Sequence, residues 1–194
     1  MSRLLVLSMF LTVDGFIEGF DGAMIRPDWS DDLEQHWSAP NMAPGSLLLY
    51  GRRAFEQNAP LWPAMAADEG NSPAFRGLAA RMNDLPKVVI SGTLVDPGWN
   101  ATVARGPLPE TVRALKRSFD GDINAVGGVT LAASLLAEDL VDEYRLLLMP
   151  SLHGGGHSVF KQAHAPIALK LQDVKRMDTG AVRLTYLRAP RTDA

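Results

Sequence analysis

The 194-residue chain is long enough to bury one sizeable core, so we expect a single domain over residues 1–190 and a frayed tail at 191–194. Its 19 basic and 22 acidic residues give a net charge of −3, and the basic residues form no stripe, which argues against a nucleic-acid partner. The absence of cysteine excludes disulfides, thiolate nucleophiles and cysteine-ligated metals, and it fits a reducing compartment.

The first predicted element is a buried strand at residues 4–11. The apolar run after Arg3 is similar to a short signal peptide, but it lacks a small-residue cleavage site. Thr12, Asp14 and Gly15 are more typical of the end of a buried strand. Because no apolar run is long enough to cross a bilayer, we expect a cytoplasmic protein with no membrane partner.

Short apolar runs alternate with helical patterns through the first three quarters of the chain. The predicted strands are residues 4–11, 46–50, 87–91 and 123–126, with a weaker one at 101–104. The predicted helices are residues 28–37, 52–58, 73–83, 109–119 and 130–138. The Pro- and Ala-rich stretch at 59–73 is predicted to be a surface loop. This alternation predicts a largely parallel sheet with helices on both faces.

The last part of the chain changes character. Residues 143–149, 168–177 and 181–187 are predicted strands with little helix between them. Asp178, Thr179 and Gly180 are typical of a hairpin turn, in which glycine supplies the positive φ. We therefore expect an antiparallel C-terminal hairpin at the edge of the sheet.

The strand at 123–126 runs into Gly127 and Gly128 and then directly into an apolar helix. Glycine lets the backbone approach a ligand closely, and the first turn of a helix offers unpaired N–H groups and a positive dipole end to a phosphate. A tight turn without any ligand is the alternative explanation of such a pair.

Four segments carry a family resemblance through their order and spacing. They are residues 8–17, 50–56, 88–94 and 126–131, the last followed by 140–143 and 150–160. Together they resemble the dihydrofolate reductase-like superfamily, most closely the reductase domain of bifunctional riboflavin biosynthesis proteins (the RibD C-terminal domain) and its stand-alone relatives. The resemblance covers nearly the whole chain. It implies a three-layer α/β/α fold with a mostly parallel eight-stranded sheet and an antiparallel C-terminal hairpin.

The resemblance also implies an NADPH-dependent oxidoreductase that transfers a hydride to a small pterin or pyrimidine-type ring. A non-catalytic nucleotide-binding or dimeric interaction protein of the same fold is the alternative. A true dihydrofolate reductase is a further interpretation, against which the lack of a clear helix carboxylate argues. The family also implies a homodimer, since its members commonly pair through their sheets.

By resemblance, Gly51, Arg52 and Arg53 meet the phosphates of NADPH, with an arginine at the adenosine 2′-phosphate. Arginine binds phosphate through two parallel hydrogen bonds and stays charged, which favours NADPH over NADH. The alternative is that both arginines only decorate a solvated helix start. Ala54 departs from the family, which usually has a hydroxyl residue there, so one phosphate donor is missing.

The remaining cofactor contacts follow from the same resemblance. Ser91, Gly92 and Thr93 flank the adenosine half, although Ser-Gly-Thr is also a good turn without any ligand. The strand-to-helix junction holds the pyrophosphate and approaches the nicotinamide, and related proteins often have a cis peptide between its two glycines. The full set of expected cofactor contacts, beyond residues 51–54, is Phe10, Ile17, Ser91, Gly92, Thr93, Val126, Gly127, Gly128, Val129, Thr130 and Leu131.

The candidate catalytic residues are Asp14, Asp32 and His36. Asp14 begins the loop that in the family folds over the nicotinamide, but it is also a turn former that bonds backbone. Asp32 is placed to hydrogen-bond a pterin-like N–C–N edge, with His36 as a proton source; an exposed i,i+4 pair is the alternative. Trp29 and Leu33 on the same helical stripe are candidate substrate contacts.

His153 and His157 frame three glycines, but a flexible glycine loop presents no rigid face for two imidazoles, and no third ligand is near in sequence. We therefore expect no metal site. By resemblance this loop joins late strands near the substrate mouth or a dimer contact.

Overall fold

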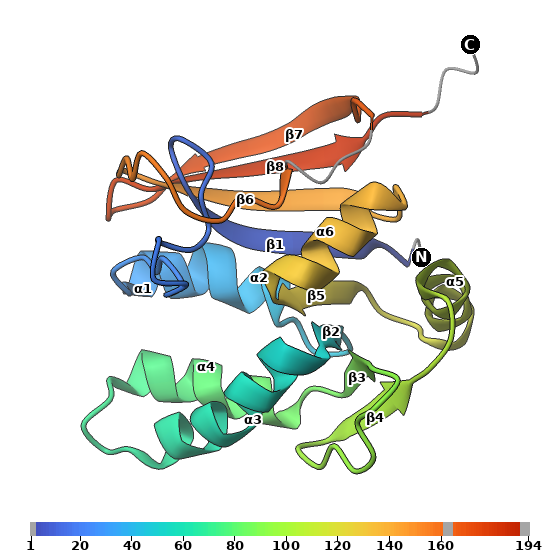
Figure 1. Ribbon diagram of the computed structural model, residues 1–194. Coiled ribbons are helices and arrows are strands. Elements are labelled where there is room, and N and C mark those ends of the chain that lie inside the picture. Colours follow the sequence, from blue (N-terminus) through green and yellow to red (C-terminus); the bar gives the residue numbers. More distant parts are fainter. Residues whose placement is uncertain (1–2, 161–164, 191–194) are drawn as a thin grey trace.

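The computed structural model describes residues 3–160 and 165–190, so the expected tail at 191–194 lies outside the described residues. Within these residues, eight strands form one sheet in the order β4-β3-β2-β5-β1-β6-β8-β7 (Figure 1). The strands are β1 (Leu5–Thr12), β2 (Leu47–Gly51), β3 (Lys87–Ile90), β4 (Ala101–Ala104), β5 (Ile123–Gly127), β6 (Glu143–Met149), β7 (Leu169–Arg176) and β8 (Val182–Arg188). Strands β1 to β6 are mutually parallel, whereas β8 is antiparallel to both β6 and β7. The expected α/β fold with its C-terminal hairpin is confirmed.

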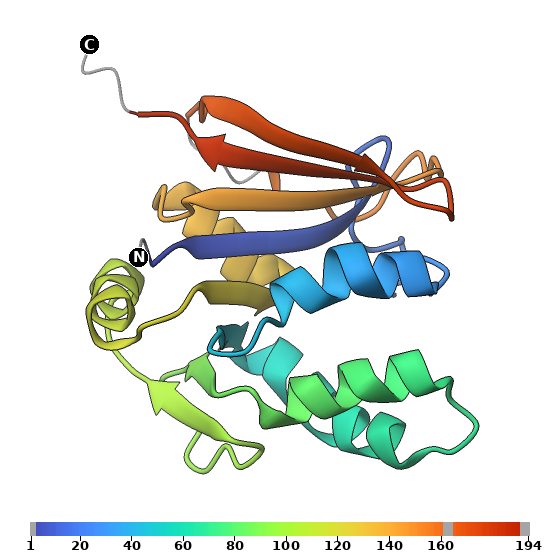
Figure 2. The same ribbon diagram turned by 180° about the vertical axis from the view of Figure 1, so that it is seen from behind.

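Helices cover both faces of the sheet (Figures 1 and 2). They are α1 (Asp31–Leu33), the π-helical η1 (Glu34–Ser38), α2 (Ala39–Asn41), α3 (Arg52–Ala67), α4 (Pro73–Asp84), α5 (Leu108–Ser118) and α6 (Val129–Ala137). Helices α5 and α6 share one apolar cluster with inward-facing residues of β1, β2 and β5. On the other face, α3 and α4 pack over β2 and β3, while η1 packs near β6.

Residues 59–67, which the sequence analysis assigns to a loop, are instead the second half of α3, with Pro60 and Pro63 inside the helix. The alanines around them favour helix, and Trp62 anchors the segment. Its indole Nε1 donates to Asn58 Oδ1 at 2.7 Å, and its ring centroid lies 6.2 Å from that of Phe75 in α4. This packing outweighs the hydrogen bonds that the two prolines remove.

The helix predicted at 28–37 begins later and ends later. Ser30 is the N-cap, and its Oγ accepts a 3.1 Å hydrogen bond from the N–H of Leu33. Helical structure then continues through the π-helical turns of η1 to Asn41. Trp29 therefore lies just before the helix, with its ring edge-on to Phe75 at 5.9 Å.

Among the described residues, no helix combines the length and the apolar character that crossing a membrane requires.

Candidate functional site

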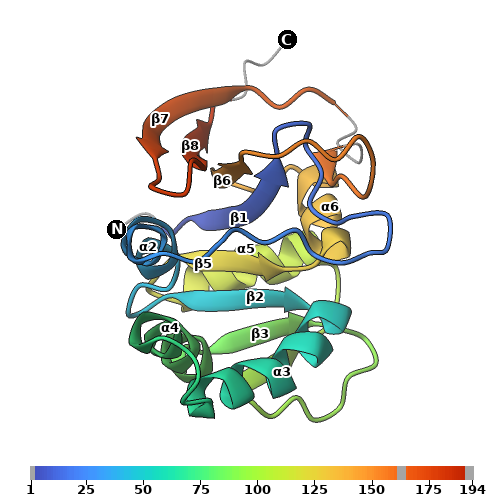
Figure 3. The same cartoon turned by 90° about the vertical axis from the view of Figure 1, so that its left-hand side faces the viewer.

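A cleft of about 830 Å³ lies where β2, β3 and β5 end, at the carboxyl edge of the parallel strands. Figure 3 shows α3 and α6 leaving the ends of the neighbouring strands β2 and β5. The lining residues are Gly51, Arg52, Arg53, Ala54, Ile90, Ser91, Gly92, Thr93, Pro107, Leu108, Pro109, Gly128, Thr130, Leu131, Ser134, Ala137 and Glu138. The structure thus brings three predicted segments, far apart in sequence, to one place.

Three helices start at this cleft, and none of them has a side-chain cap. The N-cap residues of α3, α5 and α6 are Gly51, Pro107 and Gly128, and none accepts a side-chain hydrogen bond from the first turn. The first-turn N–H groups therefore have no partner within the helix or from its cap, and each helix adds a positive dipole end. In α5 this effect is weaker, because Pro109 has no N–H group and Glu110 adds a negative charge to the first turn. Converging N-termini of this kind favour a ligand with several negative charges.

The starts of α3 and α6 lie in contact, and in each of two contacts one partner is a glycine. A Cβ on Gly51 would lie 3.4 Å from the Cβ of Leu131, and a Cβ on Gly128 would lie 3.2 Å from that of Ala54. Gly128 also has a φ of +81°, which favours glycine. No cis peptide bond occurs among the described residues, and the expected cis bond between Gly127 and Gly128 stays a prediction. Ala54 is 8% exposed, and its small side chain fits the contact.

Two adjacent arginines give the cleft its positive charge. Arg52 Nη1 donates to Oε1 and Oε2 of Glu56 at 3.1 and 3.0 Å, and both side chains are nearly half exposed. Arg53 is exposed, and no carboxylate of the described residues pairs with it. Glu138, at the far end of α6, is the carboxylate among the described lining residues. The cleft therefore has a cationic end at α3.

The Ser91 hydroxyl accepts hydrogen bonds from the N–H groups of Thr93 and Leu94 at 3.2 and 3.0 Å. This closes the turn that the sequence analysis kept as an alternative. The turn nevertheless lies on the cleft, since Ser91, Gly92 and Thr93 all line it.

Four expected cofactor contacts, Phe10, Ile17, Val126 and Val129, do not line the cleft as far as the structure describes it. Phe10 packs on Trp37, with ring centroids 5.3 Å apart, and Val126 joins the cluster under α4. Ile17 and Val129 are partly buried against the cluster shared by α5 and α6. Gly127 precedes the cap of α6. Their contact with a cofactor stays a prediction.

The cleft also contains residues that the sequence analysis missed. Pro107, Leu108 and Pro109 belong to the start of α5, which follows β4 at the same edge of the sheet. Ser134 and Glu138 lie one and two turns beyond Thr130, on one face of α6. The helix predicted at 109–119 directly follows the strand predicted at 101–104, and this order was the signal that could have indicated the place of α5 at the cleft. The face of α6 could not have been found, because the sequence does not say which face meets the cleft.

Asp14 joins two loops. Its carboxylate accepts hydrogen bonds from the N–H groups of His153 at 3.1 Å and Gly154 at 2.7 Å. Hydrogen bonds from the Thr12 side chain and then from these N–H groups lower the pKa of Asp14 to about 2. The carboxylate is therefore ionised at neutral pH and holds no proton to donate. The structure places Asp14 beyond the cleft lining, as a link between loops.

Asp32 and His36 contact the β7–β8 hairpin region instead of the cleft. Asp32 Oδ2 accepts a 3.0 Å hydrogen bond from the N–H of Asp178, and Oδ1 lies 2.9 Å from His36 Nδ1 and 3.4 Å from Lys175 Nζ. The N–H of Asp178 and then the charge of Lys175 lower the pKa of Asp32. Leu33 is fully buried between the helix and the sheet, so it has no surface to offer a substrate in this structure.

His157 lies beside a carboxylate, with its Nδ1 3.2 Å from Oε2 of Glu18. The backbones of His157 and Glu18 also pair, since the N–H of His157 donates to the Glu18 carbonyl at 3.0 Å. No three His, Asp or Glu side chains of the described residues gather in a way that would hold a metal ion.

A second hollow, of about 520 Å³, lies at the opposite edge of the sheet, beside Leu47, Leu115 and Phe119. The buried Lys87 ammonium there already donates to the carbonyls of Asn83 and Leu85, at 3.1 and 2.7 Å. Because its cation is engaged, this hollow is less suited to an anionic ligand than the cleft.

Comparison with known proteins gives one consistent result. A family model described as the RibD C-terminal domain matches residues 3–183. The uncharacterized protein YyaP of Bacillus subtilis (strain 168) is 28% identical over 190 residues, which cover 95% of this chain and 94% of that protein.

Two solved structures show the same fold. A "putative riboflavin biosynthesis protein" from Shewanella sp. PV-4 matches with a TM-score of 0.72 at 20% identity, covering 97% of this chain and 100% of that one. A diaminohydroxyphosphoribosylaminopyrimidine deaminase/5-amino-6-(5-phosphoribosylamino)uracil reductase from Thermotoga maritima matches with a TM-score of 0.66 at 16% identity. That match covers 97% of this chain and 57% of the Thermotoga chain.

Proposed function

The chain belongs to the family of the RibD C-terminal domain, and on that premise we propose that it is an NADPH-dependent oxidoreductase acting on a small heteroaromatic substrate. The observation that carries the proposal is the convergence of three uncapped helix N-termini and two arginines on one cleft of about 830 Å³. A coenzyme with a pyrophosphate and a 2′-phosphate supplies the negative charges that such a cleft favours.

The residues fit distinct parts of this coenzyme. The first turns of α3 and α6, which meet through Ala54 and Gly128, would hold the pyrophosphate by backbone N–H groups. Arg52 and Arg53 would bind the 2′-phosphate, which NADH lacks. Backbone donors of this kind compensate in part for the hydroxyl that is missing at Ala54.

The reduced nicotinamide supplies the hydride when it is bound, so the chain has to position both rings and exclude water. The substrate would bind at the carboxyl end of β1, next to β5, with Trp29 as an apolar contact. The Thermotoga relative carries the name of a 5-amino-6-(5-phosphoribosylamino)uracil reductase, and because uracil is a pyrimidine this supports a pyrimidine-type ring as the first substrate class to test. Because Asp14 is ionised at neutral pH, it would hold its own loop and the loop at His153 together. It would not supply the proton that reduction of the substrate ring requires.

Thermal unfolding with and without coenzyme tests the proposal. A ligand that binds only the folded state raises the melting temperature, so NADPH should raise it clearly more than NADH at the same concentration. Oxidation of NADPH in the presence of pyrimidine or pterin compounds then tests hydride transfer. The absence of a shift with either coenzyme would contradict the proposal.

A second candidate is a nucleotide-binding protein of the same fold that does not turn over. Both carboxylates that were expected to take part in the reaction bind backbone N–H groups instead, which favours this candidate. Asp14 holds the loop at His153, and Asp32 holds the turn at Asp178. A melting-temperature shift with NADPH, without oxidation by any ring tested, would select this candidate.

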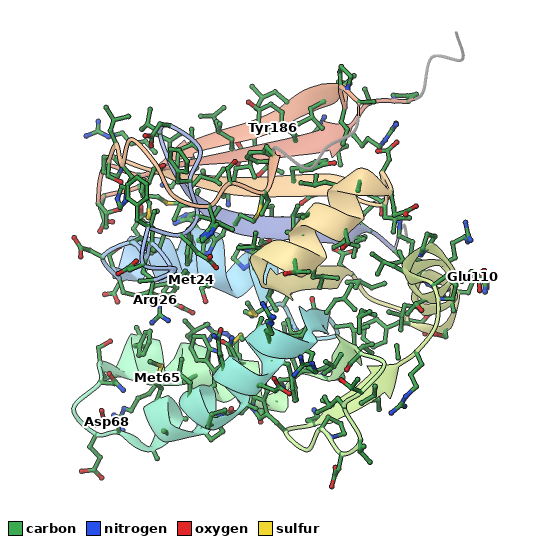
Figure 4. The ribbon with its side chains drawn as sticks, in the orientation of Figure 1. Met24, Arg26, Met65, Asp68, Glu110 and Tyr186 are labelled. Atoms are coloured by element: carbon green, nitrogen blue, oxygen red, sulfur yellow. The ribbon has the colours of Figure 1, made fainter. Side chains whose placement is uncertain are left out.

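We also propose that the protein forms a homodimer. Its location would be the cytoplasm, because reduced coenzyme is available there. The edge strand β7 exposes three apolar side chains: Leu169 is 39% exposed, Leu171 49% and Val174 53%. Tyr186 of the neighbouring strand β8 is partly buried against the apolar cluster that includes α6 (Figure 4). An exposed apolar edge of this kind favours pairing with a second copy. Sedimentation equilibrium should give twice the mass of the chain, and a monomer at all concentrations would exclude the dimer.

A further inference from the structure

Among the described residues, the guanidinium of Arg52 donates hydrogen bonds from only one of its three nitrogens. Both Glu56 oxygens accept from the same nitrogen, Nη1, at 3.1 and 3.0 Å. Nε and Nη2 of Arg52 have no partner among the described residues. Since Glu56 contacts the guanidinium only through Nη1, the edge formed by Nε and Nη2 stays available.

That available edge is the one that matches a phosphate. A guanidinium presents parallel N–H groups from Nε and Nη2, which bind two oxygens of one phosphate. Arg52 itself lines the cleft, whereas Glu56, four residues later on α3, lies outside its lining. Glu56 therefore contacts Arg52 from the second turn of the helix and leaves the cleft to the arginine.

We infer that Glu56 is a positioning residue, which holds Arg52 with its Nε–Nη2 edge towards the cleft and thereby strengthens the preference for a 2′-phosphorylated coenzyme. The inference rests on the proposed function. Arg53, which has no carboxylate partner among the described residues, has to order its own side chain on binding. Arg52 has lost part of that freedom before the ligand arrives.

The expected effect is modest because the pair is exposed, with side chains 43% and 46% accessible. Exposed ion pairs four residues apart on a helix are worth little, which corresponds to about a two-fold change in a dissociation constant. Such a change is measurable as a ratio of two ligands on the same protein, because errors in active concentration cancel.

The test compares dissociation constants for NADPH and NADH by calorimetric titration of the full chain. Glu56→Ala should lower the preference for NADPH about two-fold. Glu56→Gln keeps an oxygen that accepts from Nη1 and should retain more of the preference than Glu56→Ala. Glu69→Ala, which removes an exposed carboxylate beyond the far end of α3, is the matched control and should leave the preference unchanged.

The double variant Arg52→Gln with Glu56→Ala decides whether Glu56 acts through Arg52. It should show the same preference as Arg52→Gln alone. An unchanged or increased preference in Glu56→Ala, or a further loss in the Arg52→Gln background, would overturn the inference while leaving the proposed function intact. Failure of the unchanged protein to bind NADPH would overturn both.

Discussion

Arg53 projects from the first turn of α3 into the cleft without a carboxylate partner among the described residues. Replacing it by glutamine should weaken NADPH binding about ten-fold, the lower end for a lost charge-assisted hydrogen bond, because the site is exposed to solvent. NADH binding should change far less. Calorimetric titration measures both constants, and Arg113→Gln on the exposed side of α5 is the control. Equal losses for NADPH and NADH would contradict recognition of the 2′-phosphate.

Glycine is required at position 128 for two reasons, its positive φ and its close contact with Ala54, and a matched pair of variants separates them. Gly45 has a similar φ of +83°, but a Cβ there would meet nothing within 4 Å, whereas a Cβ at Gly128 would lie 3.2 Å from that of Ala54. Gly45→Ala should therefore cost about 1 kcal/mol, for the backbone conformation alone. Gly128→Ala should cost more in urea unfolding, and adding Ala54→Gly should recover the excess. Equal costs at both glycines would show that the contact between α3 and α6 is unimportant.

The place of a single residue could be predicted from sequence where it depends on near neighbours in the chain. Gly128 and Arg53 stand at junctions from strand to helix, as predicted, while their contact with phosphate stays a prediction. Asp32 could not be assigned in this way, because its hydrogen-bond partner Asp178 is 146 residues away. Asp14 is a similar case, since it bonds the backbone of a loop 140 residues later.

At the scale of elements, Lys87 ties the start of β3 to the end of α4 and to the loop before β4. Its ammonium donates to the carbonyls of Asn83 and Leu85 and lies 4.3 Å from the centre of the Trp99 ring. Burial lowers the pKa of Lys87 to about 8 in the folded protein. The unfolded chain, with an ordinary lysine pKa, thus binds more protons than the folded chain in mildly alkaline solution.

Linkage then gives the sign of a pH effect. Between pH of about 8 and about 10.5 the free energy of unfolding should rise with pH, as far as Lys87 contributes, because the unfolded state holds the extra proton. Urea unfolding across this window measures it. Lys87→Met should remove this contribution, whereas Lys170→Met on the exposed strand β7 should not. A Lys87→Met profile identical to that of the unchanged protein would contradict the assignment.

Helix α3 shows where element prediction from sequence stops. The pattern at 52–58 was sufficient to find its first turns, but two prolines hid the rest. Trp62→Ala should destabilise the protein by roughly 2 kcal/mol, since it removes a partly buried ring and its bond to Asn58. Circular dichroism should also show lost helix beyond Asn58. A variant with unchanged stability would show that Trp62 does not hold the second half of α3.

At the scale of the whole molecule, sheet order creates the cleft. Strand β5 lies between β1 and β2, and β3 follows β2, so the ends of β2, β3 and β5 are adjacent although they span residues 51 to 127. The parallel sheet and its C-terminal hairpin followed from apolar runs and one turn. The contribution of the far turns of α6 to the cleft did not, because helix orientation depends on packing across the sheet.

The carboxyl-edge cleft should bind NADPH, and a crystal structure of the protein grown with NADPH would show whether it does. We predict that the pyrophosphate lies at the first turns of α3 and α6, with the 2′-phosphate at Arg52 and Arg53. A cleft that stays empty at saturating NADPH would contradict the account, as would coenzyme bound in the hollow beside Phe119 at the opposite edge.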